Sequence, residues 1–365
     1  MAPLLQKLQT AVFSPQSIPW ILYHKFGTKF SSHILRTRAL APETVNIYPT
    51  FRCNLKCEMC FEKFAKVEQE LRANDWLRIV DDVKKFHSRI HISGGESFVF
   101  TDIIKIIKHI KDNNLYLVIT TNGTFLEEYA EMLVKFRVDR VDISIDGPED
   151  VHDRIRGVRG TFNKILRGLE KVNSVKKHLP VIKINSIINF TEPETMKEIV
   201  ALAQQYRASV SQFIYPFYLG KEAIQQHKKL LQDMLGREIN YWCQASHYQP
   251  KSGDFGRIQS VIKELARKNV IIDVFPHFNA EQFNAYYNSP RDFDNVYKGG
   301  CQAMWNTLTI LPDGSIESCP DYVVGNINKE KSLDAWNNQA MAELRKIIIN
   351  KKFFSVCRAC CFYYQ

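Results

Sequence analysis

The stretch TFRCNLKCEMCF, residues 50–61, decides the fold and the chemistry that we expect of this chain. Its three cysteines, Cys53, Cys57 and Cys60, have the spacing C-x₃-C-x₂-C and follow the short apolar run VNIYPT, which predicts a strand. Three thiolates from one loop can ligate three irons of a four-iron cluster, so that the fourth iron stays open to a small molecule. Zinc sites usually need four ligands, most often from two C-x₂-C pairs. The loop therefore indicates an open iron–sulfur cluster rather than zinc.

Three further motifs follow, each after a predicted strand: Ser-Gly-Gly-Glu at 93–96, Thr-Asn-Gly at 121–123 and Ser-Ile-Asp-Gly-Pro at 144–148. Each motif alone is weak, but the cysteine loop and these three in order resemble radical S-adenosylmethionine (SAM) enzymes. The resemblance implies a cluster that binds the amino group and carboxylate of SAM. Such a cluster, once reduced, cleaves SAM to methionine and a 5′-deoxyadenosyl radical that abstracts a hydrogen atom from the substrate, while the protein orients the reactants.

The resemblance also implies a set of cofactor-binding residues: Met59, Gly94, Gly95, Glu96, Asn122, Ser144 and Arg156. The two glycines lack side chains, so their backbone can come close to the methionine part of SAM. Glu96 is a candidate partner of the amino group, directly or through the placement of the backbone. By resemblance, the backbone of Met59 meets the adenine edge, and Ser144 contacts the ribose or the carboxylate.

The region after the fourth predicted strand leaves two choices open. Arg156, in the run HDRIR, is a candidate clamp for the SAM carboxylate, but Arg154 and Arg159 compete with it, and a solvated arginine at a helix entry is the alternative. Asp146 more often shapes an Asp-Gly-Pro turn than contacts a ligand.

Strands and helices alternate from about residue 46 to 216. The expected strands are 45–50, 89–93, 115–120, 140–145, 181–188 and 209–217, and the expected helices between them are 66–86, 102–113, 125–136, 161–177 and 193–206. Six β/α units in a row predict a parallel sheet with right-handed crossovers. The resemblance implies an α/β fold, a partial (β/α)₆ TIM-type barrel, and every motif lies at the carboxyl end of a strand, where such barrels carry their chemistry.

A second group of cysteines lies near the carboxyl end: Cys301, Cys319, Cys357, Cys360 and Cys361. A predicted β-hairpin, with its turn at Pro-Asp-Gly 312–314, separates the first two, and a predicted helix at about 333–349 precedes the last three. This order of hairpin, helix and C-x₂-C resembles the auxiliary-cluster domain called SPASM, or its shorter form called twitch.

The cysteine count favours the twitch form with one auxiliary [4Fe–4S] cluster. Five cysteines remain, and the chain stops four residues after Cys361, whereas two clusters need about seven or eight. The expected ligands are Cys301, Cys319, Cys357 and Cys360, with Cys361 either a substitute for Cys360 or a nearby free thiol. Four thiolates also suit zinc, which is the alternative.

Composition places limits on the class of protein. The chain has 365 residues and nine cysteines, and their clustering indicates metal ligands rather than disulfides, hence a reducing cytoplasm. We find no signal peptide and no run long enough for a membrane helix. The net charge of +10 favours an anionic substrate, partner or surface. The basic residues are scattered and form no arginine-rich run, which argues against nucleic acid.

We expect four parts: a basic amphipathic extension at 1–44, the radical SAM barrel at 45–220, a linker or substrate-cavity segment at 221–300, and the twitch-type domain at 301–365. The first part, with five Lys or Arg against the single acid Glu43, is expected to cap the barrel, and contact with an anionic membrane surface is the alternative. Cys243 is expected to be a buried, inert thiol.

The expected function is abstraction of a hydrogen atom from a small molecule such as a sugar, aminocyclitol or lipid head group. The auxiliary cluster then accepts an electron, so that the net reaction is an oxidation. Maturation of a peptide or protein side chain is the alternative, and a non-catalytic iron–sulfur or zinc module is a third reading, against which the intact Gly-Gly-Glu motif argues. The resemblance implies an electron donor such as flavodoxin or ferredoxin. No general base is identifiable; His277 or Tyr297 could move a proton, but ordinary packing is the simpler account of both.

Overall fold

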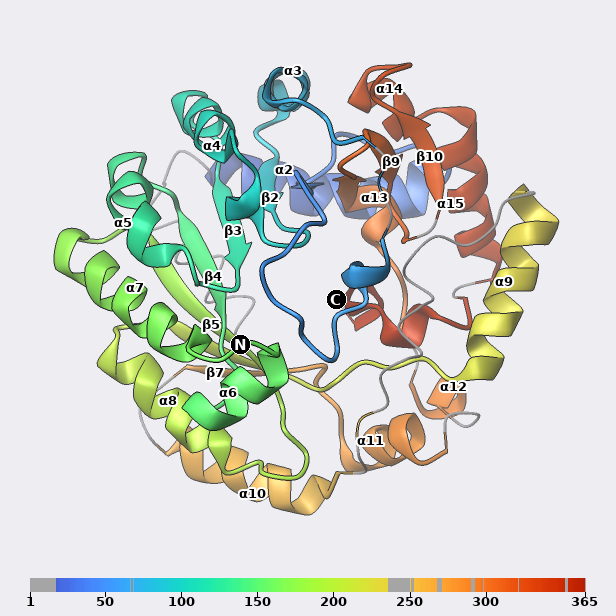
Figure 1. The fold of residues 1–365 in the computed structure, drawn as a ribbon. Helices are drawn as coiled ribbons and strands as arrows, with labels where there is room; N and C mark the ends of the chain where they lie inside the picture. The colour runs from blue at the N-terminus through green and yellow to red at the C-terminus, as the bar shows by residue number, and fades with distance from the viewer. Residues whose placement is uncertain are drawn as a thin grey trace.

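A ten-stranded sheet curves into an open barrel with helices on its outside (Figure 1). The computed structural model describes residues 18–364 apart from 66, 68, 236–249, 251–252, 268–270, 290–292, 298, 321 and 352–353. Cys243 therefore lies outside the described residues. The strand order is β10-β9-β8-β1-β2-β3-β4-β5-β6-β7, in which the neighbours from β8 to β7 pair in parallel.

The elements have the following bounds. The strands are β1 Thr44–Ile47, β2 Arg89–Ile92, β3 Leu117–Thr121, β4 Arg140–Ser144, β5 Val181–Ile187, β6 Val210–Ile214, β7 Ile272–Phe275, β8 Thr307–Ile310, β9 Ser315–Glu317 and β10 Val323–Asn326. The helices are α2 Ile18–Phe30, α3 Ala73–Val83, α4 Ile103–Asp112, α5 Leu126–Lys135, α6 Glu149–Arg156, α7 Thr161–Val175, α8 Thr195–Gln205, α9 Lys221–Leu235, α10 Phe255–Ala266, α11 Ala280–Tyr287, α12 Phe293–Val296, α13 Ala303–Asn306, α14 Ser332–Trp336 and α15 Gln339–Lys351.

The predicted α/β partial barrel is confirmed, and its six predicted strands are β1 to β6. Three details differ. The helix expected from 66 begins only at Ala73, because the Asp75 carboxylate accepts a hydrogen bond from the Arg72 backbone N–H (3.0 Å) and so caps the helix there. The helix expected at 333–349 is two helices, because the Asn338 side chain accepts from the Met341 backbone N–H (2.9 Å) and starts α15. Strand β7, within the segment expected to be a linker or to wall the substrate cavity, extends the parallel sheet.

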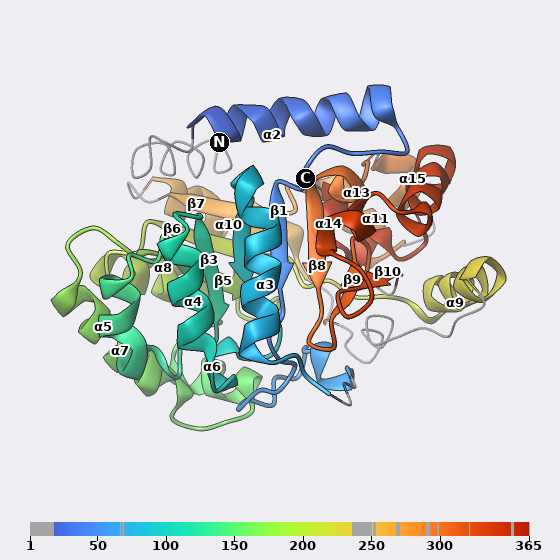
Figure 2. The ribbon, with the colours of Figure 1, turned by 90° about the horizontal axis from the view of Figure 1, so that it is seen from above.

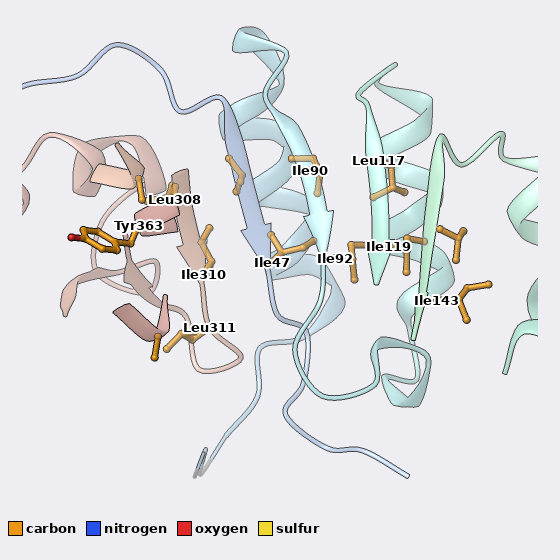
Figure 3. Packing of buried hydrophobic residues seen from close by; sticks show 14 of the residues in the cluster. Ile47, Ile90, Ile92, Leu117, Ile119, Ile143, Leu308, Ile310, Leu311 and Tyr363 are labelled. Carbon is orange, nitrogen blue, oxygen red and sulfur yellow. The ribbon is translucent and has the colours of Figure 1, made fainter. Parts of the chain in front are cut away.

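Apolar and polar side chains alternate along the barrel strands, because successive residues of a strand point to opposite faces. Ile47, Ile90 and Ile119 are fully buried on the outer face, where Figure 3 shows the isoleucines of neighbouring strands side by side. Helix α4 covers this face with residues spaced three and four apart, Ile103, Ile106, Ile107 and Ile110. The opposite face carries polar residues such as Asn46 and His91, so the barrel interior is not an apolar core.

The carboxyl-terminal hairpin is part of the barrel sheet. Strand β8 pairs in parallel with β1, with Thr44 opposite Thr307 and Ile47 opposite Ile310. Strands β8 and β9 form the predicted antiparallel hairpin, and Gly314 in its turn has a φ of +83°, which favours glycine. The pairing joins the auxiliary-cluster region to the first strand of the barrel.

Helix α2 lies across the amino-terminal end of the barrel strands, along one edge of the molecule (Figure 2). The chain that follows it is fixed to the carboxyl-terminal region: the Trp305 side chain donates to the Arg36 carbonyl (2.6 Å), and the Asn337 side chain donates to the Ala39 carbonyl (2.8 Å). Within α2, the His24 side chain hydrogen-bonds the Phe86 carbonyl (3.0 Å). This placement agrees with the expected barrel cap.

Candidate functional site

The cysteine loop follows β1 and is held against the Ser-Gly-Gly-Glu turn that follows β2. The backbone N–H of Gly95 donates to the Thr50 carbonyl (3.0 Å), and that of Glu96 donates to the Arg52 carbonyl (2.9 Å). A Cβ on Gly95 would lie 2.3 Å from the Arg52 oxygen, and one on Gly94, whose φ is +112°, would lie 2.7 Å from the Thr50 oxygen. Only glycines allow this approach. The glycines thus let the cysteine loop approach the turn, and their contact with SAM stays a prediction.

Glu96 organises the Thr-Asn-Gly turn from within the protein. Its carboxylate is fully buried and accepts from the Thr121 hydroxyl (2.8 Å) and from the backbone N–H of Asn122 (2.7 Å). Burial raises the pKa of Glu96 to about 7, although these hydrogen bonds oppose the rise. Of the two roles considered for Glu96, these contacts favour placement of the backbone.

Two polar side chains point at the sulfurs of the cysteine loop. The Asn122 amide nitrogen lies 3.8 Å from Cys53 Sγ, and Arg156 Nη1 lies 3.7 Å from Cys57 Sγ. N–H groups aimed at ligand sulfurs tune a bound iron–sulfur cluster. The loop therefore has both the thiols for a cluster and the outer donors that such clusters use.

Arg156 is also paired with Asp146. Their Nη2 and Oδ2 atoms are 2.6 Å apart, with Arg156 only 12% exposed and Asp146 fully buried. Asp146 accepts a further hydrogen bond from the Ile187 backbone N–H (2.9 Å). The competing Arg154 is largely exposed and lies near Glu192. Of Arg154 and Arg156, Arg156 is thus the one that contacts the cysteine loop, and its role as a clamp on SAM stays a prediction.

Ser144 and Met59 lie apart from these contacts. Ser144 ends β4 opposite Asn185 of β5, whose amide oxygen is buried and has no hydrogen-bond partner among the described residues. Met59 lines the barrel cavity. An unpaired buried oxygen at the carboxyl end of the strands fits a site that binds a polar cofactor. Asn185 is a candidate that the sequence analysis missed, because no motif surrounds it.

The auxiliary cysteines gather around one small hollow. Cys301, Cys319, Cys357 and Cys360 line a space of about 20 Å³, together with apolar residues. Cys361 is not among its lining residues and faces the larger barrel cavity beside Cys360. Among the described residues, no group of three or more His, Cys, Asp or Glu side chains is placed so that it could hold a single metal ion. The donor set of four thiols from a hairpin and a following turn fits a fully ligated cluster.

A cavity of about 950 Å³ occupies the barrel interior. Met59 and Glu62 line it at the carboxyl ends of the strands, Lys25 and Lys29 of α2 line it at the opposite end, and Cys360 lies in its wall. The regions of the two cysteine groups thus open onto one space.

The wall of this cavity is a network of polar side chains that crosses from strand to strand. His91 hydrogen-bonds Asn46 (3.2 Å), and burial lowers the pKa of His91 to about 4, so the ring is neutral at neutral pH. Farther round, the lining residue Gln212 accepts a hydrogen bond from Lys183 (2.8 Å) and donates one to the lining residue Asp273 (2.5 Å). The lining therefore offers both donors and acceptors.

Two lining residues, Tyr48 and Glu62, were missed by the sequence analysis. Tyr48 lies near the auxiliary cysteines: burial raises its pKa well above the ordinary value, and Glu62, Cys361 and Cys360 are close enough to add to this rise. Burial raises the pKa of Glu62 to about 8. Strand alternation could have found Tyr48, because it has the same parity as the inward-facing Asn46.

The two residues considered for proton transfer differ in position. His277 lines the cavity and lies 3.7 Å from Asp273. Tyr297 stacks on Phe293, with ring centroids 5.4 Å apart, and contacts Tyr364. Tyr297 therefore has the contacts of a packed aromatic residue.

Known proteins match both cysteine regions. The family model of the radical SAM superfamily matches residues 47–205, and that of the SPASM iron–sulfur cluster-binding domain matches residues 301–361. The chain therefore belongs to the radical SAM superfamily and carries a carboxyl-terminal SPASM-type domain. The two domains imply a SAM-binding cluster and an auxiliary [4Fe–4S] cluster, as predicted. The twitch form with a single auxiliary cluster stays a prediction.

Curated relatives match over less than half of this chain. The Fe-coproporphyrin III synthase of Methanosarcina barkeri is 31% identical over 169 residues, which are 45% of this chain and 42% of that protein. A probable GTP 3′,8-cyclase of Methanococcus maripaludis is 35% identical over 140 residues, 37% of this chain and 46% of that protein. The chain thus spans less than half the length of these relatives.

Solved structures share the fold over most of the chain. Streptococcus suis SuiB bound to the precursor peptide SuiA matches with a TM-score of 0.64 at 19% identity, over 91% of this chain and 73% of that one. Native anSMEcpe with bound AdoMet matches with a TM-score of 0.55 at 19% identity, over 87% and 88%. At this identity the likeness concerns the fold.

The close approach at Gly95 predicts a selective effect of adding one methyl group. Gly95→Ala should push the Gly-Gly-Glu turn off the cysteine loop and lower 5′-deoxyadenosine formation by about a hundredfold, since misplacement by about 1 Å has that order of effect. Gly220→Ala is the control, because its Cβ would meet nothing within 4 Å. Wild-type activity in Gly95→Ala would contradict this account.

The buried Arg156–Asp146 pair predicts a stability loss. Arg156→Ala leaves the Asp146 carboxylate buried and unpaired, which should lower the free energy of unfolding by about 3–5 kcal/mol. Adding Asp146→Asn should recover part of this loss, and the exposed Arg154→Ala should change it by no more than about 0.5 kcal/mol. Urea unfolding of the four proteins measures the differences; equal effects of the two arginine variants would refute the prediction.

The lining of the small hollow predicts which of two adjacent cysteines is a ligand. Wild type and Cys361→Ala should each bind about eight irons per chain after anaerobic reconstitution, and Cys360→Ala about four. Iron and sulfide analysis checks this, and the reverse pattern would make Cys361 the fourth ligand.

Proposed function

We propose that the protein is a radical SAM oxidoreductase that abstracts a hydrogen atom from a polar small molecule, such as a sugar, aminocyclitol or lipid head group. The barrel cavity is the observation that supports this function. Met59 of the cysteine loop and Cys360 and Cys361 of the auxiliary region line the same space. A substrate bound there would have the radical-generating site on one side and the electron acceptor on the other.

Seven cysteines would hold the two clusters: Cys53, Cys57 and Cys60 the SAM-binding one, and Cys301, Cys319, Cys357 and Cys360 the auxiliary one. When bound, SAM on the first cluster supplies the radical that takes the hydrogen atom, and the auxiliary cluster supplies the acceptor that makes the reaction a net oxidation. The protein's own part is to hold SAM against the Gly-Gly-Glu turn and to keep the substrate in the barrel, away from bulk water.

The size and lining of the cavity favour a small polar substrate over an apolar one. About 950 Å³ lies at the upper end of typical small-molecule pockets, about 300–1,000 Å³. Charges of both signs line it, including Arg89, Arg140, Asp273 and Glu317. Such a lining can bind hydroxyl, amino and anionic groups of one substrate through paired hydrogen bonds.

The reductant proposed for the SAM-binding cluster is a flavodoxin or ferredoxin. The net charge of +10 would attract an anionic partner of this kind and speed the encounter at low salt.

Removal of the first cluster tests the catalytic assignment. Replacing Cys53, Cys57 and Cys60 with Ala should lower the iron content from about eight to about four, because the auxiliary site is left intact. It should also abolish 5′-deoxyadenosine formation, because the cluster that binds SAM is lost. The measurement is iron analysis with a SAM-cleavage assay under reducing conditions. A fall from about four irons to none would instead mean that the carboxyl-terminal cysteines hold no cluster, and the net oxidation would be refuted.

The substrate class is tested by following the abstracted hydrogen. Extract of cells grown in heavy water is split by size into small molecules and peptides, and each fraction is added to reconstituted enzyme. Deuterium in 5′-deoxyadenosine from the small-molecule fraction supports the proposal. Deuterium only from the peptide fraction contradicts it and supports the peptide maturase that the sequence also allowed.

A further inference from the structure

The outward face of α2 carries a line of large apolar side chains. Leu22, Phe26, Phe30 and Ile34 are spaced four residues apart, on α2 and the π-helical turn that follows it. They are 50%, 68%, 48% and 66% exposed. These four residues, called here the α2 stripe, are among the few large apolar side chains that the described residues expose. A contiguous exposed line of this kind marks an interaction surface.

Helix α2 exposes its apolar side, whereas an ordinary surface helix buries its apolar side against the core. The residues that α2 turns toward the barrel are polar or small: His24, Gly27, Thr28 and Ser31 are buried. The hydrogen bond from His24 to the Phe86 carbonyl (3.0 Å) and the one that the Ser31 hydroxyl accepts from the Leu40 backbone N–H (3.0 Å) fix this orientation. A rotation of α2 about its axis that buried the stripe would break both of these hydrogen bonds.

The charge around the stripe identifies the occupant. Lys25, Lys29, Arg36 and Arg38 are exposed beside it, and residues 18–42 contain no Asp or Glu. Two copies packed stripe to stripe would bring these positive charges together. An anionic phospholipid surface instead offers negative head groups to the basic residues and acyl chains to the stripe.

We propose that α2 docks the protein on the surface of an anionic phospholipid bilayer. The stripe enters the boundary between head groups and acyl chains, and the basic residues contact the anionic head groups. The helix lies in the plane of the membrane, since none of the described helices has the length and apolarity to cross one. Because Lys25, Thr28 and Lys29 also line the cavity, docking brings that end of the cavity next to the lipid head groups.

The test measures binding to vesicles of phosphatidylcholine alone and with phosphatidylglycerol added, by co-sedimentation of the reconstituted full chain. Wild type should bind the anionic vesicles, more weakly as salt rises. Phe26→Ser and, separately, Lys25→Glu with Lys29→Glu should each weaken binding about tenfold or more. The matched controls are Ile104→Ser, 41% exposed on α4, and Lys228→Glu with Lys229→Glu on α9, which makes the same charge change. Both controls should bind like wild type.

Several outcomes would overturn the proposal. These are no binding of wild type to anionic vesicles, equal binding to neutral vesicles, and equal losses in the α2 variants and their controls. Light scattering that shows a dimer converted to a monomer by Phe26→Ser would make a second copy the occupant instead. Iron content and circular dichroism establish that each variant is folded. A Phe26→Trp variant gives a second readout, since its fluorescence should be quenched by brominated lipid in anionic vesicles only.

Discussion

The contact of two backbone turns at the carboxyl end of the barrel governs the rest of the site. The Gly-Gly-Glu turn lies so close to the cysteine loop that backbone carbonyls of the loop occupy the positions where side chains of Gly94 and Gly95 would be. Two hydrogen bonds connect this contact to the next motif. Glu96 binds the Thr-Asn-Gly turn, and Asn122 of that turn reaches back to Cys53. Three motifs that are far apart in sequence are therefore joined by hydrogen bonds around the thiols of the cysteine loop.

Polar side chains gather on the inner face of the barrel sheet, and the outer face is mostly apolar. Parallel sheets covered on both faces usually consist of continuous apolar runs. Here the outer face is apolar, and the inner face carries, beside some apolar side chains, buried ionisable and amide groups that hydrogen-bond one another, such as Lys183, Gln212 and Asp273. Burying such groups costs free energy unless they are paired. That cost is consistent with an interior shaped for polar ligands rather than for stability alone.

The sequence predicts the parts of this protein that depend on local pattern. The six strands and the hairpin turn at Gly314 follow from alternation and turn chemistry, and the cysteine loop follows from its spacing. The sequence does not predict the contacts that join segments far apart in the chain. The pairing of Arg156 with Asp146 depends on where α6 ends relative to β4, and the cavity positions of Tyr48 and Glu62 depend on how the loop folds back over the barrel. The contact of the cysteine loop with Gly94 and Gly95 shows the same limit, because the motif indicates a close approach of backbone without indicating which segment of the chain approaches.

The pairing of β8 with β1 has a consequence for how the chain is made. Asn46 and Thr309, which hydrogen-bond across this pair, are 263 residues apart in sequence. During synthesis, β1 and its cysteine loop leave the ribosome long before the strand that covers their open side exists. Contacts of such long range form late, and an unpaired strand edge is prone to wrong pairing in the meantime. The thiols of the first loop are therefore part of an incomplete barrel during most of translation. Their surroundings become complete only when β8 of the carboxyl-terminal hairpin pairs with β1.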